Sequence, residues 1–370
     1  MIQIEQLIMH RMKMPLKHPF TNSRRTIDEK DFYIIELVDQ AGNRGYGETV
    51  AFDTPWYTEE TTTTVRYIME HELAPILATP FDHPSSFIKR CQPVRRHQMA
   101  KAAVEGAIWD LYAKQHDVPL YKAIGGTNSQ VPVGAAIGMK EDIPTLIEAI
   151  QREIDHGYKR IKLKIKPGRD LQILDAVRSE FPDILLMADA NSAYTLDDLD
   201  HIKQFDQFDL MMIEQPLAHD DFVDHAILQK EIRTPICLDE SIHTLSDVKT
   251  AIALHSCQII SVKLGKAGGF SQAKRIHDLC AENNIQVWCG GMLEAGVGRA
   301  QSLALATLPN FTLPADPGAS NRYWHQDIIN PEVEINNGII TLPDKPGIGY
   351  DIDEEALQFY RTERKSIPIT

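Results

Sequence analysis

The sequence predicts an α/β protein in which a parallel βα barrel is covered by a smaller α+β domain. The main observation is a series of short, strand-like runs between residues 160 and 263 that recur at a nearly constant interval. An interval of about 25 residues is too long for a hairpin, but it fits a strand, a helix and a return. Each run carries a charged residue near its C-terminal end. These residues, spaced by 25, 25, 25 and 24 positions, are Lys164, Asp189, Glu214, Asp239 and Lys263.

The charged residues at the strand ends predict a metal site. Repeated right-handed βα units close into a barrel whose C-terminal strand ends meet at one mouth. Three carboxylates brought together there would repel one another unless a cation lay between them. Oxygen ligands favour a hard divalent ion, so we expect magnesium (Mg²⁺), with manganese as the alternative. The predicted metal ligands are Asp189, Glu214 and Asp239.

The first of these runs carries a second lysine on the same face. Residues 161–166 alternate in the manner of a strand, so Lys162 and Lys164 should both face the barrel axis. Taken alone, such a run is more typical of an edge strand with solvated lysines. The three carboxylates in register favour a role for these lysines at the barrel mouth.

The chain before the barrel shows two different patterns. Residues 1 to about 50 alternate like the strands of an antiparallel sheet, whereas residues 58–116 follow a helical pattern. Two segments, 19–25 and 48–56, interrupt these patterns. Each is either a solvated connection or a lid over the barrel mouth.

Breaks in the strand and helix patterns, such as the one at Gly125-Gly126, predict three segments. Residues 1–125 form the first part of a capping domain, residues 126–325 form the barrel with the active site, and residues 326–370 return to the cap. The first barrel strand is expected at residues 131–138. In the last segment, Asn337-Gly338 lies between two alternating runs, which is a strong hairpin signal. We expect this last segment to return to the N-terminal sheet, so that the capping domain is discontinuous.

Composition argues against several classes of function. The 370-residue chain carries a net charge of −14 and has no basic stripe, so we expect no nucleic-acid partner. No apolar run approaches the length needed to cross a bilayer, and the N-terminus does not resemble a signal peptide. Five widely spaced cysteines indicate reduced thiols. We therefore expect a cytoplasmic protein without a membrane partner.

The motifs of the chain resemble those of a known family. In order they read KLKIKPG, ADANSAYTL, IEQPL, ICLDESI and WCGGMLEAGVGRA. Together they resemble the enolase superfamily and, within it, the muconate-lactonising subgroup. The chain is most similar to the branch of o-succinylbenzoate synthases and N-succinyl- or N-acylamino acid racemases. The resemblance covers the whole chain. It implies a (β/α)7β TIM-like barrel with an α+β capping domain built from both ends of the chain, and a homo-oligomer that acts on a small carboxylate.

The resemblance also implies roles for the two lysine strands. Lys164 would be the base, and Lys263 would lie on the opposite side of the substrate. Lys162 would either favour the neutral form of the base or only balance the charge of the metal site. Removing a proton next to a carboxylate produces an enediolate, whose charge a divalent cation stabilises. A lysine base with Mg²⁺ is the arrangement described for enolase-type sites.

Further residues follow the family pattern. Asn191 and Glu240 would orient the metal ligands, although each could instead cap a loop. Gly291 and Met292 would offer backbone N–H groups to a substrate carboxylate. Glu294 would either contact substrate or serve the structure of its loop.

Two reactions are compatible with these residues. The first is dehydration of 2-succinyl-6-hydroxy-2,4-cyclohexadiene-1-carboxylate to o-succinylbenzoate in menaquinone biosynthesis, with Lys164 as base. The second is racemisation of N-succinyl or N-acylamino acids by both lysines, and one protein can perform both. A non-catalytic barrel that binds an acid, and a cycloisomerase, remain alternatives.

Three positions bear on the choice among these reactions. Ala136 stands where close relatives often have serine, which puts fine specificity in doubt. Lys266 replaces an arginine common in racemases and lacks its planar fork, which weakens the racemase interpretation slightly. Asp316 is a single aspartate after the eighth strand, which disfavours a dipeptide epimerase.

Overall fold

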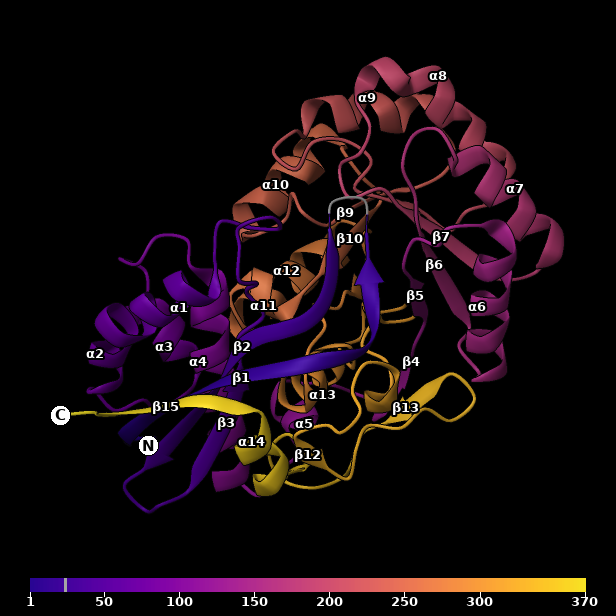
Figure 1. Ribbon diagram of the computed structural model, residues 1–370. Coiled ribbons are helices and arrows are strands. Elements are labelled where there is room, and N and C mark those ends of the chain that lie inside the picture. The colour runs from indigo at the N-terminus through magenta and orange to yellow at the C-terminus, as the bar shows by residue number, and fades with distance from the viewer. Residues whose placement is uncertain (23–24) are drawn as a thin grey trace.

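The computed structural model describes residues 1–22 and 25–370 and consists of a capping domain and a barrel (Figure 1). The capping domain contains an antiparallel sheet of strand order β15-β1-β2-β3. These strands are β1 (Ile4–Thr21), β2 (Thr26–Asp39), β3 (Arg44–Glu48) and β15 (Arg361–Pro368). The first and last strands of the chain are neighbours, so both termini lie at this end of the molecule.

One long helix connects the capping sheet to the barrel. Helix α4 (Gln98–Gln115) packs against β3 on one side and α11 on another, and it is buried along almost its whole length. A Cβ atom on Gly47 would lie 1.9 Å from the carbonyl oxygen of Ala103, so only glycine allows this close approach. The other cap helices are α1 (Thr62–Ile68), a π-helical segment (Met69–Leu73), α2 (Ala74–Leu77), α3 (Ser85–Arg90) and α5 (Leu120–Ala123).

The barrel contains a curled parallel sheet in the order of the chain. Its strands are β5 (Ala135–Ile137), β6 (Arg160–Lys164), β7 (Leu185–Asp189), β8 (Ile213–Glu214), β9 (Ile236–Leu238), β10 (Ile259–Val262) and β11 (Gln286–Cys289). Residues 311–316 close it. Phe311 forms a parallel bridge with Val287 beside β11, and Ala315 forms one with Val133 before β5. The predicted α/β barrel with a capping domain is therefore confirmed.

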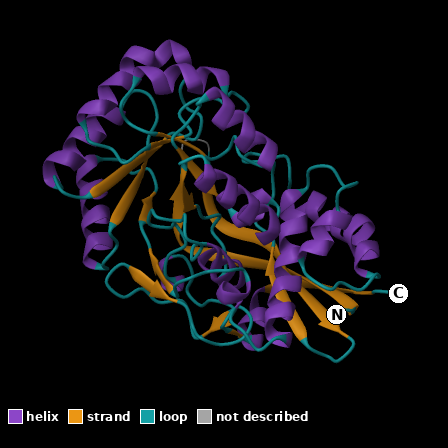
Figure 2. Cartoon of the chain, turned by 180° about the vertical axis from the view of Figure 1, so that it is seen from behind, coloured by secondary structure: helices purple, strands orange, loops and turns teal. Residues whose placement is uncertain are grey.

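Helices form a layer around the outside of the curled sheet (Figure 2). They follow the strands in the order expected for βα units. They are α6 (Ile143–Asp155), α7 (Asp170–Glu180), α8 (Leu199–Ile202), α9 (Val223–Glu231), α10 (Leu245–Leu254), α11 (Leu264–Ala267), α12 (Phe270–Glu282) and α13 (Gly296–Leu305). Helix α6 ends before Gly157, whose φ of 94° suits the left-handed end of a helix.

The C-terminal segment reaches the capping sheet through its last strand and not through the Asn337-Gly338 turn. Asn337 and Gly338 do form a tight turn, with φ values of 50° and 80°. The strand after the turn, β13 (Ile339–Thr341), pairs with β4 (Gln130–Pro132) and not with the N-terminal sheet. It is β15, after helix α14 (Glu354–Tyr360), that joins that sheet. The Asn-Gly pair favours a tight turn, but it carries no information about which strand will pair with β13. The remaining short strands, β12 (Ile329–Asn330) and β14 (Asp351–Ile352), pair with each other.

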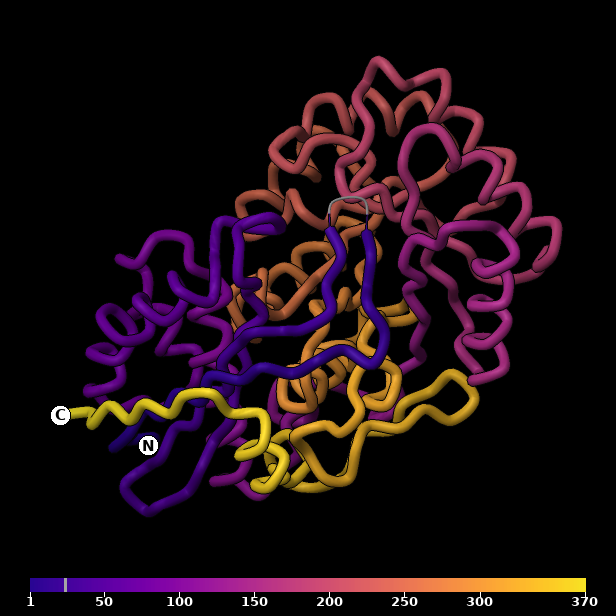
Figure 3. Tube along the Cα trace, in the orientation of Figure 1, coloured from indigo at the N-terminus to yellow at the C-terminus, as the bar shows by residue number. Residues whose placement is uncertain are grey.

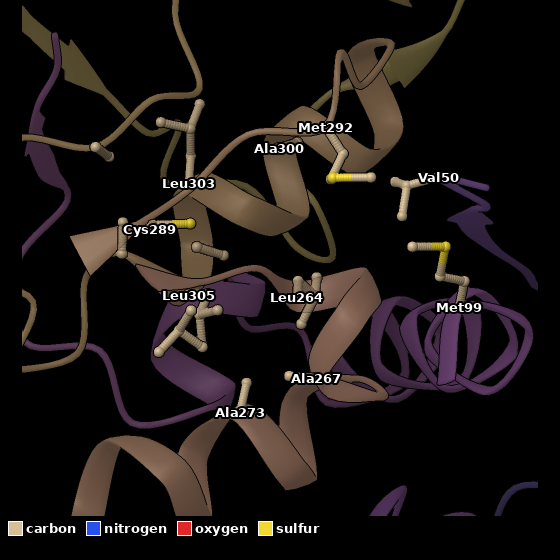
Figure 4. Close-up of a cluster of buried hydrophobic side chains, with 14 of the residues drawn as sticks. Val50, Met99, Leu264, Ala267, Ala273, Cys289, Met292, Ala300, Leu303 and Leu305 are labelled. Atoms are coloured by element: carbon tan, nitrogen blue, oxygen red, sulfur yellow. The ribbon is translucent and has the colours of Figure 1, made fainter. Parts of the chain in front are cut away.

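The capping domain covers the barrel through apolar contacts and through a long hairpin. In Figure 4, Val50 and Met99 of the cap face Leu264 and Met292 of the barrel. The β1–β2 hairpin runs from the capping sheet to the barrel (Figure 3), where the Met139 N–H donates to the Thr21 carbonyl at 2.9 Å. The predicted lid 19–25 lies at the end of this hairpin, and its residues 23–24 fall outside the described part of the chain.

The remaining expectations concern cysteines and membranes. All five cysteines are free and buried. Within the described chain, none of the helices combines the length and the apolar character that a membrane span requires.

Candidate active site

The register of the parallel strands places three of the predicted residues at one level. Lys164 at the end of β6 lies opposite Asp189 of β7, and Asp189 lies opposite Glu214 of β8. Asp239 follows the end of β9 and Lys263 follows the end of β10. The spacing of about 25 residues therefore brings these side chains to one end of the sheet, as the sequence suggested.

The two outer lysines each pair with a carboxylate of the trio. Lys164 Nζ donates to Asp189 Oδ2 at 2.5 Å and to Asn191 Oδ1 at 2.8 Å. Lys263 Nζ donates to Asp239 Oδ2 at 2.7 Å. These lysines stand on strands separated by β7, β8 and β9, and both line the same cavity. A small molecule in this cavity can have one amine on each side.

Lys162 lies deeper and is surrounded by carboxylates. Its Nζ donates to Asp316 Oδ2 at 2.5 Å and to Glu214 Oε2 at 3.2 Å, and lies 3.6 Å from Asp189 Oδ2. Burial alone would lower the pKa of Lys162, but these carboxylates outweigh burial and raise the pKa above its usual value. In this geometry Lys162 balances the charge of the surrounding carboxylates, which is one of the two roles that the sequence left open.

The trio of carboxylates provides the donor set of a hard divalent cation. Among residues 1–22 and 25–370, no three His, Cys, Asp or Glu side chains are already gathered as a metal site. Instead, Asp189 and Asp239 face lysines. Glu214 has one carboxylate oxygen, Oε1, that is buried and lacks a hydrogen-bond partner within the described chain. A buried carboxylate oxygen normally has a hydrogen-bond donor or a cation as its partner, so this oxygen and the two neighbouring carboxylates fit a cation.

The pKa values of Glu214 and Asp239 are shifted in opposite directions. Burial and the neighbouring Asp189 raise the pKa of Glu214 well above its usual value. Burial would also raise the pKa of Asp239, but Lys263 and Lys266 outweigh burial and hold that pKa far below its usual range. Burial would lower the pKa of Lys263, but Asp239, Glu214 and Glu240 outweigh it and raise that pKa. Lys263 is therefore held in its charged form.

The two predicted orienting residues contact each other. Asn191 Nδ2 donates to Glu240 Oε1 at 2.8 Å, and the Asn191 N–H donates to Asp189 Oδ1 at 3.1 Å. Asn191 and Gln215, which lie within two residues after the end of a ligand-bearing strand, have φ values of 47° and 41°. Left-handed backbone at a non-glycine residue is uncommon and clusters at functional sites.

An open cavity of about 680 Å³ lies over the lysines. Its walls include the predicted substrate-contact residues Gly291, Met292 and Glu294. Ala136, which stands where close relatives often have serine, also lines it. The Glu294 carboxylate accepts from the Met292 N–H at 2.9 Å and from Ser302 Oγ at 3.3 Å. Glu294 therefore shapes its own loop, and a Met292 N–H that already donates to it is not a free donor for substrate.

Both predicted lids reach this cavity. Phe20 and Asn22 come from the first lid, and Phe52 and Trp56 from the second. Arg25 joins the two lids, because its Nη1 donates to Asp53 Oδ1 at 3.0 Å and to Thr54 Oγ1 at 2.6 Å. The two predicted lids are therefore linked to each other by hydrogen bonds.

Several functional residues were missed by sequence reasoning. Tyr57 lies one residue beyond the predicted second lid, yet its hydroxyl donates to Asp239 and accepts from Lys263 Nζ at 2.7 Å. Asp316 was noted only as a lone aspartate, yet it binds both Lys162 and Arg160. Its position at the end of the segment that closes the barrel was the signal that could have identified it.

A buried ion pair from the cap also shapes the site. Lys30 Nζ donates to Glu48 Oε1 at 3.1 Å and to the Leu293 carbonyl at 2.8 Å. Glu48 accepts from the N–H groups of Ala295 and Gly298 at 2.8 and 2.7 Å. Leu293, in the loop that lines the cavity, has a φ of 58°, a conformation that costs a non-glycine residue about 1–3 kcal/mol. The capping domain thus holds this loop in place.

Two family models match the chain. One, Enolase C-terminal domain-like, matches residues 145–356. The other, Mandelate racemase / muconate lactonizing enzyme, N-terminal domain, matches residues 4–125. The chain belongs to the enolase superfamily. The resemblance found in the motifs is therefore confirmed, and enzymes of this superfamily typically use a divalent metal ion.

Relatives with different names share most of their length with this member of the superfamily. The o-succinylbenzoate synthase of Geobacillus stearothermophilus is 53% identical over 360 residues, which cover 97% of this chain and 96% of the relative. The N-succinylamino acid racemase of Thermus thermophilus is 41% identical over 349 residues, covering 94% of each. A solved structure from Listeria innocua, described as a member of the enolase superfamily, has a TM-score of 0.97 at 44% identity and full coverage of both chains.

Proposed function

We propose that this protein is an o-succinylbenzoate synthase that depends on Mg²⁺. The observation that carries the proposal is the pair of buried lysines, Lys164 and Lys263, on opposite sides of one cavity beside three carboxylates. Relatives named o-succinylbenzoate synthase at 46–53% identity over nearly the full length support the choice of reaction.

The carboxylates that would hold the metal are Asp189, Glu214 and Asp239. When bound, a divalent cation supplies positive charge that stabilises the negative charge developing on the substrate carboxylate. If Asp189 served as a ligand, Lys164 would lose its present ion-pair partner and would be released toward the cavity, where a base is required.

The chain's own residues then perform the dehydration. Lys164 Nζ removes the proton from the ring carbon that bears the carboxylate. The resulting ammonium returns a proton to the neighbouring hydroxyl, which leaves as water, and the ring becomes aromatic. Lys263 stays charged on the other side and stabilises the anionic intermediate.

Racemisation of N-succinylamino acids is the second candidate. The same geometry supports it, because an α-carbon between Lys164 and Lys263 can lose its proton to one amine and receive a proton from the other. A racemase relative at 41% identity adds to this support. A non-catalytic barrel would keep the cavity but would not exchange the α-proton of a bound acid with solvent.

A paired assay of the purified protein with Mg²⁺ tests the proposal. One part follows dehydration of 2-succinyl-6-hydroxy-2,4-cyclohexadiene-1-carboxylate by ultraviolet absorbance, and the other follows the optical rotation of N-succinylamino acids. We expect dehydration to be far faster than racemisation. Racemisation with negligible dehydration would reverse the choice, and no activity in either part, without α-proton exchange, would favour a binding protein.

The proposed function also predicts where the protein acts in the cell and which partner it binds. An o-succinylbenzoate synthase supplies an aromatic precursor of menaquinone, which places the enzyme in the cytoplasm with a small dianion as its partner. The resemblance to the superfamily further suggests a homo-oligomer, which sedimentation of the purified protein would test.

A further inference from the structure

A second, larger cavity of about 1730 Å³ adjoins the catalytic one. It lies between the end of the β1 strand and the segment that follows β5. Phe20, Ala136 and Tyr323 line both cavities, so the two share a wall. The two cavities therefore meet at these three residues, and Lys164 lines the smaller one.

The larger cavity is strongly cationic although the chain as a whole is acidic. Lys17, Lys140, Arg152 and Arg322 line it, and among the residues that the structure describes Glu153 is the one acid that does so. The whole chain has a net charge of −14. We call this cavity the cationic groove. A concentration of one sign of charge against the overall charge of a protein creates a local potential that attracts ligands of the opposite sign.

Three of these cations have no acidic partner. Lys17, Lys140 and Arg152 are exposed, and none of them forms an ion pair within the described chain. Lys17 donates only to a backbone carbonyl, that of Asn321, at 3.2 Å. Elsewhere on the surface, lysines such as Lys122 and Lys203 lie within 2.7 Å of a carboxylate. The positive charge of the groove is therefore left available to an anion.

The fourth cation stands at the wall between the two cavities. Arg322 Nη2 donates to the Ala136 carbonyl at 2.7 Å, and Nη1 donates to the Tyr323 hydroxyl at 2.6 Å. Its Nε lies 3.3 Å from Glu153 Oε2, so the one acid of the groove is already engaged. The guanidinium also lies over the rings of Tyr158 and Tyr323. Arg322 is thus a fixed positive charge beside the catalytic cavity.

We propose that the cationic groove captures organic dicarboxylates and directs them into the catalytic cavity. This inference rests on the proposed function, because the proposed substrate carries two carboxylates. A groove of exposed, flexible cations that ends at a fixed one raises the local concentration of a dianion without holding it tightly. It acts on association and leaves the chemical step to the lysines at the barrel mouth.

Neutralising the three unpaired cations tests the proposal. The variant K17Q/K140Q/R152Q is compared with K89Q/K230Q/K249Q, which removes the same charge at exposed lysines that line neither cavity. We measure kcat and kcat/KM for dehydration, and the Kd of 2-succinylbenzoate by calorimetry with Mg²⁺. At low ionic strength we expect the groove variant to lose about tenfold in kcat/KM and in affinity, with kcat unchanged. The loss should shrink at about 0.5 M salt, where screening is strong.

The outcomes separate the two claims. Equal losses in the two triple variants, or a loss of kcat in the groove variant alone, would overturn the proposed groove while leaving the synthase intact. If the wild-type protein fails to dehydrate the substrate but the groove variant still loses affinity for 2-succinylbenzoate, the proposed function is wrong and the groove stands. A loss that does not depend on salt would also overturn the groove, because a steering effect must be screened.

Discussion

Two buried lysine–carboxylate pairs in this protein have similar chemistry but different surroundings. The side chains of Lys30 and Glu48 are fully buried, and those of Lys164 and Asp189 are 8% and 2% exposed. In the first pair, both Glu48 oxygens accept backbone N–H groups, and Lys30 holds the Leu293 carbonyl. Its partners are therefore parts of the backbone that cannot exchange without moving the fold.

The second pair has partners that can change. Lys164 donates to the side chains of Asp189 and Asn191, and it lines the catalytic cavity. Burial and charge alone thus do not distinguish a structural ion pair from a catalytic one. A catalytic pair is distinguished from a structural one by its access to a cavity and by partner groups that are free to change. Substitutions at the two pairs should therefore have different effects.

The largest expected effect is on catalysis. Lys263→Ala should reduce kcat for dehydration by about 10²–10⁴-fold, because the anionic intermediate loses its charged partner. Folding should be retained, since the lysine faces a cavity. The measurement is the ultraviolet assay, together with urea unfolding of the same protein. A variant that keeps more than about a tenth of the wild-type rate would contradict the role of Lys263.

The cap pair should show the opposite behaviour. Lys30→Met should lower the free energy of unfolding by about 3–5 kcal/mol, because Glu48 is left buried without its positive partner. Chemical denaturation measures this effect, and Lys30→Met/Glu48→Gln should recover part of the loss. As a control, Lys203→Met breaks an exposed pair with Glu231 and should leave the free energy of unfolding close to that of the wild-type protein. Equal costs at the two sites would refute the structural role.

Metal removal should affect both activity and stability. A chelator should abolish dehydration, and restoring Mg²⁺ at about 100 times its Kd should raise the free energy of unfolding by about 2.7 kcal/mol. Asp239→Asn should lose most of this response, whereas Asp344→Asn, at an exposed position, should keep it. A thermal midpoint that responds to Mg²⁺ equally in both variants would place the metal elsewhere.

A smaller effect concerns pH and a contact between the cap and the barrel. Glu105 of α4 accepts from the Ser271 N–H of α12, and burial raises the pKa of Glu105 to about 7. The folded protein therefore keeps a proton here that the unfolded chain has lost between about pH 4.5 and 7, so this residue lowers stability as pH rises through that window. In Glu105→Gln this loss should disappear, a difference on the order of 1–3 kcal/mol by pH 8. The exposed Glu59→Gln should follow the wild-type pH curve in denaturant titrations, and a parallel curve for Glu105→Gln would contradict the assignment.

The sequence predicted the site best in the βα units, where strands recur at a constant spacing along the chain. Lys164, Asp189, Glu214, Asp239 and Lys263 were found because parallel strands of constant spacing end at one level. Sequence spacing then becomes spatial proximity without any knowledge of the side-chain contacts.

The residues that were missed belong to segments without that repeat. Tyr57 comes from a loop, and Lys30 and Glu48 come from the cap, more than 200 residues before the loop that they hold. The pairing of β13 with β4 was not predicted for a related reason, because the Asn337-Gly338 turn specifies a hairpin but not the strand beside it. Contacts between distant segments depend on how the two parts dock, which no local pattern encodes.

The most direct test of this contrast is the dehydration turnover of Lys164→Ala, measured with Mg²⁺ on protein whose folding is followed in the same sample. Our account predicts a loss of at least about 10³-fold in kcat with an unfolding midpoint no lower than that of the wild-type protein. A turnover within about tenfold of wild type, or a loss that only follows unfolding, would show that Lys164 is a structural residue like Lys30 and would contradict its role as the base.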